Sequence, residues 1–165
     1  MSSEKSRRSL VRASEIAKQE QRFSHPWNPD SEVRGTRLSR LTDLSRVGVS
    51  LVRIAPGKES FVYHSHYCEE EWVYILSGQG IAEIDGQEHE IGPGDFMGFG
   101  TPSVAHHLRN PFDTELVYLM GGESGDVEIA DFPKLNRRML RRGAVVEVYP
   151  LDGGKPFVVP PGETK

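Results

Sequence analysis

The chain has 165 residues and a net charge of −4, with 17 glycines, 11 prolines and a single cysteine, Cys68. This length fits one domain that folds alone, and the acidic balance argues against a nucleic-acid-binding surface. One cysteine excludes an intrachain disulfide and fits a reducing compartment. No apolar run is long enough to span a membrane, and the first residues lack the apolar stretch of a secretion signal. We therefore expect a soluble, cytoplasmic protein that binds neither nucleic acid nor membrane.

Residues 1–44 are expected to form an N-terminal extension with little regular structure. The first 13 residues are polar and basic, as in a frayed tail. Ser14 is a candidate N-cap for a short helix that ends near Arg22. Two prolines within residues 24–30 exclude a regular element there, and Trp27 is expected to close one end of a barrel or to cover a partner surface.

From Val47 onward, short apolar runs alternate with glycine and proline turns, which is the pattern of an all-β domain. Asp85-Gly86 is the strongest hairpin signal, because this pair favours a two-residue turn. The spacing of the runs fits a sandwich or a barrel. The expected strands are 47–54, 59–66, 71–76, 81–84, 88–91, 96–99, 105–109 and 115–120.

After Gly122 the regular alternation fades, so residues 123–165 are expected to form a C-terminal extension that packs on the barrel or on a second subunit. A short helix is predicted over 131–142 and a strand over 145–149. The helix would carry four arginines on a solvated or interface face rather than at an anion site. Residues 156–161, Pro-Phe-Val-Val-Pro-Pro, are expected to be an extended tail.

Two histidines mark the most informative stretch. His64 and His66 stand two residues apart, so on a strand both imidazoles point to the same face. Glu71 opens the next apolar run, which can pair back as a hairpin and bring its carboxylate to the same point. A later strand adds a further histidine, His106 or His107. Three nitrogens and one oxygen suit a divalent zinc, nickel, manganese or iron ion and leave coordination positions open.

Other side chains near this cluster are alternative ligands. Glu69 and Glu70 compete with Glu71 as the carboxylate, and Cys68 is a candidate soft ligand. We expect the two glutamates to stay solvated at the mouth of the barrel and Cys68 to be a small loop residue. His25 and His89 are expected to be surface or structural residues.

The spacing of these residues resembles the two motifs of the cupin superfamily. The residues that match the first motif are Gly57, His64, His66, Glu71 and Gly78. The residues that match the second motif are Pro93, Gly94, His106 and Asn110. The three residues between His106 and Asn110 favour His106 over His107 as the ligand. The chain departs from the strict pattern in two places, before His64 and before His106, where the intervals are longer.

The resemblance covers roughly residues 45–122 and implies a single-domain cupin barrel. The implied fold is a double-stranded β-helix, or jelly roll, between short helical or irregular N- and C-terminal extensions. One metal would sit inside the barrel, and its implied ligands are His64, His66, Glu71 and His106. Barrels of this family often pair into homodimers, so a homodimer is expected.

Alternation along the strands also predicts which residues surround the metal. If Glu71 and His106 point inward, the residues two and four positions further along each strand point inward as well. The predicted substrate-binding residues are Val73, Ile75, Leu108 and Asn110. An apolar wall with a few polar groups beside a metal is typical of a small-molecule site.

Fold and ligands together do not name a reaction. We predict a metal-dependent enzyme acting on a small polar substrate, with sugar-phosphate isomerase chemistry ahead of two alternatives. These are an iron-dependent dioxygenase and a non-catalytic module that binds a small molecule. An isomerase needs a base, for which the candidates are Glu69, Glu70 and Tyr63. It also needs cations for a phosphate group, for which the candidates are Arg53, Lys58 and Arg109.

Overall fold

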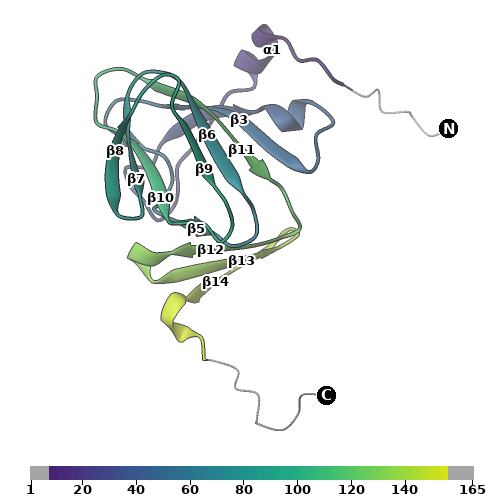
Figure 1. The fold of residues 1–165 in the computed structure, drawn as a ribbon. Coiled ribbons are helices and arrows are strands. Elements are labelled where there is room, and N and C mark those ends of the chain that lie inside the picture. The colour runs from purple at the N-terminus through teal and green to yellow at the C-terminus, as the bar shows by residue number, and fades with distance from the viewer. Residues whose placement is uncertain (1–7, 156–165) are drawn as a thin grey trace, which may run out of the picture.

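The computed structural model describes residues 8–155, so the tail expected over 156–161 lies outside the described residues. Its strands form three antiparallel sheets, and Figure 1 shows a barrel with a smaller sheet across one end. The expected all-β jelly roll is confirmed. Within the described residues, no helix has both the length and the apolar character needed to cross a membrane.

The largest sheet has six strands and contains the central wall of the barrel. In spatial order the strands are β1 (Gln21–Phe23), β2 (Val33–Arg37), β3 (Val47–Ile54), β11 (Leu116–Glu123), β6 (Glu71–Ser77) and β9 (Phe96–Phe99). Strand β11 lies at the centre and pairs along its whole length with β3. Strand β2 pairs with β3 from Val33 to Arg37. The N-terminal extension is therefore part of the barrel wall and not only a tail and loop.

A second sheet faces the first across the core. Its strands, in order, are β4 (Lys58–Glu59), β10 (His106–Asn110), β7 (Gly80–Ile84) and β8 (Gln87–Ile91). The predicted Asp85-Gly86 turn joins β7 to β8, and both residues have positive φ, 51° and 74°. Both residues of a type I′ turn need positive φ, which glycine adopts freely and aspartate tolerates.

The third sheet lies below the barrel in Figure 1. It consists of β14 (Val145–Pro150), β13 (Arg137–Arg142), β12 (Val127–Phe132) and the short β5 (Ser65–His66). The helix predicted over 131–142 is wrong, because this segment completes β12, makes one turn of 3-10 helix, η2 (Pro133–Leu135), and returns as β13. Met139 packs against the smaller part of the core, although arginines stand on both sides of it in the sequence.

Two further expectations need correction. The strand expected over 59–66 is interrupted, because β4 pairs with β10 while β5 pairs with β12 in a different sheet. The N-terminal helix, α1 (Ala13–Lys18), has its N-cap at Arg12 rather than Ser14. It ends at Lys18, since residues 21–23 pair with β2 instead. Two single turns of 3-10 helix complete the fold, η1 (Leu38–Leu41) and η3 (Leu151–Gly153).

The core has two parts. The larger lies between the six-stranded sheet and the sheet that contains β10, and includes the fully buried Ile54, Ile75 and Leu116. The smaller lies under the third sheet, where Trp27 packs edge-on against Phe132 with ring centroids 5.1 Å apart. Trp27 thus helps to close the end of the barrel next to the predicted metal site.

Candidate metal centre

Four side chains converge where the barrel meets the third sheet. His64 forms an isolated antiparallel bridge with His106, the first residue of β10, through N–H···O bonds of 3.1 and 2.8 Å. His66 lies on β5 and Glu71 opens β6. The bridge holds His64 and His106 at one level, and alternation along the chain then returns His66 to the same face.

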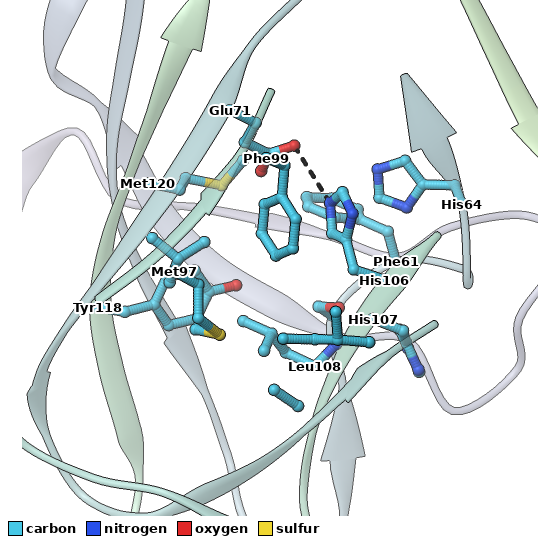
Figure 2. A pocket seen from close by; sticks show the side chains of 14 residues that line it. Phe61, His64, Glu71, Met97, Phe99, His106, His107, Leu108, Tyr118 and Met120 are labelled. Carbon is cyan, nitrogen blue, oxygen red and sulfur yellow. Dashed lines mark hydrogen bonds and ion pairs between the residues drawn. The ribbon is translucent and has the colours of Figure 1, made fainter. Parts of the chain in front are cut away.

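The ligand atoms of these four residues all lie within 4.8 Å of one another. His66 Nε2 is 3.1 Å from His64 Nε2 and 3.0 Å from Glu71 Oε2. His106 Nε2 is 3.6 Å from the same Glu71 oxygen. The structure therefore brings together the four residues predicted as metal ligands, and Figure 2 shows three of them, Glu71, His64 and His106, facing one point.

Backbone carbonyls orient two of the imidazoles. His64 Nδ1 lies 2.6 Å from the Val62 carbonyl oxygen, and His106 Nδ1 lies 3.1 Å from that of Val104. A carbonyl only accepts, so each Nδ1 carries the hydrogen and each Nε2 turns its lone pair to the cluster. Among the described residues, the buried His106 Nε2 has no hydrogen-bond partner. An orphaned buried nitrogen beside a carboxylate and two further imidazoles fits a bound divalent metal.

The protonation of the cluster also suits a cation. Burial, and the neighbouring His106 and His66, lower the pKa of His64 to about 3, so this imidazole is neutral at physiological pH. Burial opposes ionisation of Glu71, but the neighbouring His106 and His66 outweigh it and lower its pKa. Burial likewise opposes the charged form of His66, yet Glu71 and Glu128 raise its pKa. The raised pKa favours the protonated imidazole of His66 in the metal-free cluster, and metal binding would displace that proton.

A small apolar cavity adjoins three of the four residues. His64, Glu71 and His106 stand at one end, and the side chains labelled around the rest are mostly apolar (Figure 2). The apolar lining residues include Phe61, Val73, Ala82, Ile84, Met97, Phe99, Leu108 and Met120. Water is therefore disfavoured on this side of the cluster.

The four predicted substrate-binding residues separate into two pairs. Val73 and Leu108 line the cavity as expected. Ile75 is fully buried in the core and Asn110 is 1% exposed, and neither lines the cavity. The Asn110 amide instead donates to the carbonyls of Ile54 and Thr114. Alternation gave these two residues the correct face, but they lie too far along their strands to reach the cluster.

A polar groove reaches the cluster from the other side. His66 and Glu71 belong to it, together with Glu69, Glu70 and Glu123. Arg37 is the only described residue lining this groove that carries a permanent positive charge. The four predicted ligands thus lie between an apolar cavity and a polar groove.

The alternative ligands lie outside the cluster. Glu69 accepts hydrogen bonds from Arg141 and from the Gly125 N–H, and Glu70 is exposed in the groove. Cys68 is exposed as well. The His107 imidazole turns away from the cluster in Figure 2, and its Nε2 lies 3.5 Å from Glu59 Oε2.

The remaining candidates from the sequence lie elsewhere. His25 packs against Trp27 and His89 is exposed on β8. The phosphate candidates Arg53, Lys58 and Arg109 line neither the cavity nor the groove.

One residue next to the cluster escaped the sequence analysis. Glu128, on β12, is 2% exposed and places Oε1 3.5 Å from His66 Nδ1. Glu128 alternates with Ala130 and Phe132 and so lies on the buried face of β12. An acidic residue at a core-facing position is the one feature of the sequence that points to a role for Glu128. Its partner stands 62 positions earlier in the chain, a separation at which the sequence shows no connection.

This geometry defines a small single-barrel protein with an internal three-histidine, one-glutamate site, and the chain belongs to the cupin superfamily. A family model described as a cupin domain matches residues 50–122. A protein of Acidithiobacillus ferrooxidans with the provisional name sugar phosphate isomerase is similar over 91% of this chain and 97% of its own, with 32% identity and a TM-score of 0.87.

Three further relatives match less of this chain. A sugar phosphate isomerase from Silicibacter pomeroyi, 24% identical over 86% of this chain and 94% of its own, shares the fold with a TM-score of 0.75. A predicted oxalate decarboxylase of Thermotoga maritima is 26% identical over 69% of this chain and 97% of its own, with a TM-score of 0.59. An uncharacterized protein of Methanocaldococcus jannaschii is 33% identical over 57 residues, which are 34% of this chain. The match spans 45% of that relative's length.

Proposed function

We propose that this protein is a metal-dependent enzyme that isomerises a small sugar phosphate. The observation that carries the proposal is the position of the histidine and glutamate cluster, which has a polar groove on one side and a dry cavity on the other. A sugar phosphate is polar and carries a carbonyl next to a hydroxyl group. The likeness to the Acidithiobacillus ferrooxidans protein, at 32% identity over nearly the whole chain, supports this substrate class.

Different residues would serve the separate steps of an aldose–ketose isomerisation. When bound by His64, His66, Glu71 and His106, a divalent metal supplies a Lewis acid that polarises a carbonyl. The substrate enters through the groove, since His66 and Glu71 are the predicted ligands that line it. A proton must then leave one carbon and return to its neighbour, which requires a base within reach of the substrate.

Glu70 is the base that the groove offers. Its carboxylate is exposed there and accepts no hydrogen bond from the part of the chain that the structure describes. Glu69 is held by Arg141 and the Gly125 N–H. Tyr63 lies under the Lys134 ammonium group, 4.4 Å from its ring centroid, and does not line the groove. Arg37 is left to receive the anionic end of the substrate.

The test follows the proton rather than the product. The protein is stripped with a chelator, reloaded with zinc, nickel, manganese or iron(II) in turn, and incubated with aldose and ketose phosphates in deuterated water. We expect metal-dependent incorporation of deuterium next to the carbonyl, detected by proton NMR. Glu70→Gln should abolish the incorporation while metal still binds, and Glu90→Gln, an exposed carboxylate on β8, should not. Tight metal binding without exchange in any compound would overturn the proposal.

One observation favours a second candidate, an iron-dependent dioxygenase. The apolar cavity reaches three of the predicted ligands, and dioxygen is a small apolar molecule that partitions into such a space. Oxygen consumption by the iron(II)-loaded protein, measured with an electrode in the presence of hydroxy and keto acids, separates the two candidates. Uptake that depends on substrate, with no deuterium exchange in sugar phosphates, would replace the isomerase with the dioxygenase.

A further inference from the structure

Glu128 is a buried carboxylate that no motif of the chain accounts for. It is 2% exposed, and its Oε2 has no hydrogen-bond partner among the described residues. It lies on β12, beyond the segment 50–122 that matches the cupin domain. Burying a carboxylate costs free energy unless its charge is compensated nearby. The position of Glu128 therefore calls for a positive partner.

His66 is the ion-pair partner that the structure offers Glu128. Its Nδ1 is 3.5 Å from Glu128 Oε1, while its Nε2 faces Glu71 at 3.0 Å on the other side of the ring. Within the described residues, no lysine or arginine forms an ion pair with Glu128. His66 Nδ1 in turn has no hydrogen-bond partner among these residues, and its polar contact there is the 3.5 Å ion pair with Glu128 Oε1.

Backbone pairing fixes this contact. Strand β12 pairs with β5 so that Ala130 stands opposite His66. The same register brings Glu128 to the loop that follows His66, where Oε1 accepts the N–H groups of Tyr67 at 3.0 Å and Cys68 at 3.5 Å. Glu128 therefore contacts the side chain of one predicted ligand and the loop that leads to the next, Glu71.

We propose that Glu128 is a positioning residue for the metal site. It holds the Nδ1–H of His66, so that the lone pair of Nε2 points at the metal. His64 and His106 have backbone carbonyls in the corresponding position, and His66 has Glu128. The charges also balance, because the carboxylates of Glu71 and Glu128 together neutralise a divalent cation. A carboxylate behind a metal-binding imidazole orients the ring and raises its basicity. This inference rests on the metal site proposed above.

The variants separate the charge from the loop contact. Glu128→Gln keeps an acceptor oxygen and removes the charge, whereas Glu128→Ala removes both. Asp131→Asn is the matched control, because Asp131 is a buried carboxylate on the same strand that pairs with Arg138 and touches no predicted ligand. Zinc binding is measured by competition with a chelating dye. We expect the affinity to fall about 10- to 100-fold in the Glu128 variants, more in Ala than in Gln, and to stay unchanged in Asp131→Asn.

A second readout distinguishes positioning from a merely structural role. In zinc-loaded wild-type protein with ¹⁵N-labelled histidine, NMR should show His66 protonated at Nδ1 and bound through Nε2, and in Glu128→Ala the Nδ1–H signal should broaden or shift. Wild-type affinity in Glu128→Gln and Glu128→Ala, or coordination through Nδ1, would overturn the inference. If the variants do not fold, the wild-type nitrogen assignment decides. A wild-type protein that binds no zinc would refute the metal site itself, which is a different result.

Discussion

The ring of Phe99 lies flat against the imidazole of His106, with ring centroids 3.7 Å apart and an interplanar angle of 8°. Phe99 is also the cross-strand partner of Glu71 in the pairing of β6 with β9. Both rings are buried. One aromatic side chain thus limits the rotation of a predicted ligand and walls off the apolar cavity.

Removing this ring should loosen the site as well as the core. Phe99→Ala leaves a cavity and is expected to cost about 3–5 kcal/mol of unfolding free energy. Zinc affinity should fall as well, because the His106 ring becomes free to tilt. The control is Phe96→Ala on the same strand, where the side chain is 65% exposed and little should change. Urea denaturation and dye competition measure the two effects, and unchanged zinc affinity in Phe99→Ala would contradict the role given to the stacking.

The adjacent histidines of β10 provide a direct test of the ligand set. His106→Ala should abolish stoichiometric metal binding, because it removes a nitrogen from the cluster. His107→Ala should retain it, because the His107 ring faces Glu59 instead. Metal content after reloading and gel filtration, measured by elemental mass spectrometry, is the readout. Equal loss of metal in both variants would show that His106 is not specifically a ligand.

The histidine cluster should make the metal-free protein sensitive to acid. The pKa of His64 falls from 6.5 to about 3, chiefly by burial, so between these values the unfolded chain binds a proton that the folded chain does not. Stability therefore declines as the pH falls through this window, by up to about 1.4 kcal/mol per pH unit. The lowered pKa of Glu71 acts in the same direction at the acid end. The raised pKa of His66 contributes stability that is lost only as the pH rises above about 6.5.

The matched measurement uses His64→Gln, which cannot take up this proton. Urea denaturation of the metal-free proteins across the window from pH 6.5 to about 3 gives the slope of unfolding free energy against pH. We expect a steeper slope in the wild type, by up to about 1.4 kcal/mol per pH unit, which corresponds to one proton. Parallel slopes would mean that His64 keeps an ordinary pKa in the folded protein.

Where local pattern decides the structure, the sequence predicted it well. The strand over 47–54, the Asp85-Gly86 turn and the convergence of His64 with His66 depend on alternation and short spacing, and all three are present in the structure. The helix predicted over 131–142 failed for a physical reason. Three of the four arginines of β13 are half-buried, and guanidinium groups among them meet distant partners, such as Trp27 and Glu69. Those partners cannot be read from a local pattern.

For the candidate site, too, the sequence predicted what local spacing decides and not what depends on long-range pairing. Ligand spacing identified the four clustered residues, but alternation alone cannot say how far along a strand the cavity extends, and Ile75 and Asn110 do not line it. Glu128 escaped because its contact depends on β12 pairing with β5, a long-range register that begins outside the motifs.

The two glycines of the first motif should respond differently to alanine. Gly57 and Gly78 both have positive φ, 73° and 78°, so each substitution strains the backbone by about 1–2 kcal/mol. A Cβ at Gly57 would meet nothing within 4 Å, whereas one at Gly78 would lie 2.1 Å from the Glu115 carbonyl oxygen. Gly78→Ala must therefore also displace β11, and thermal denaturation should show a clearly larger loss than for Gly57→Ala. Equal losses would mean that the positive φ alone accounts for the stability lost at both positions.

Asn110 should prove to be a structural residue and not a substrate contact. Its side chain donates to the carbonyls of Ile54 and Thr114 and accepts the Phe112 N–H at 3.1 Å. Asn110→Ala leaves these groups unpaired, at about 1–3 kcal/mol for each one that water cannot reach. We expect a marked fall in unfolding free energy with wild-type zinc affinity.

The neighbouring Arg109 is the control for Asn110, because its guanidinium pairs with the exposed Glu88 and its removal should cost no more than about 0.5 kcal/mol. If Asn110→Ala instead kept its stability and lost activity toward the substrate, the amide would have to reach the site in a conformation other than this one. The carbonyls of Ile54 and Thr114 would then need new partners, since both accept from the same buried nitrogen. Hydrogen exchange at the Phe112 amide, slow in the wild type and fast in the variant, would reveal which of the two roles the side chain has.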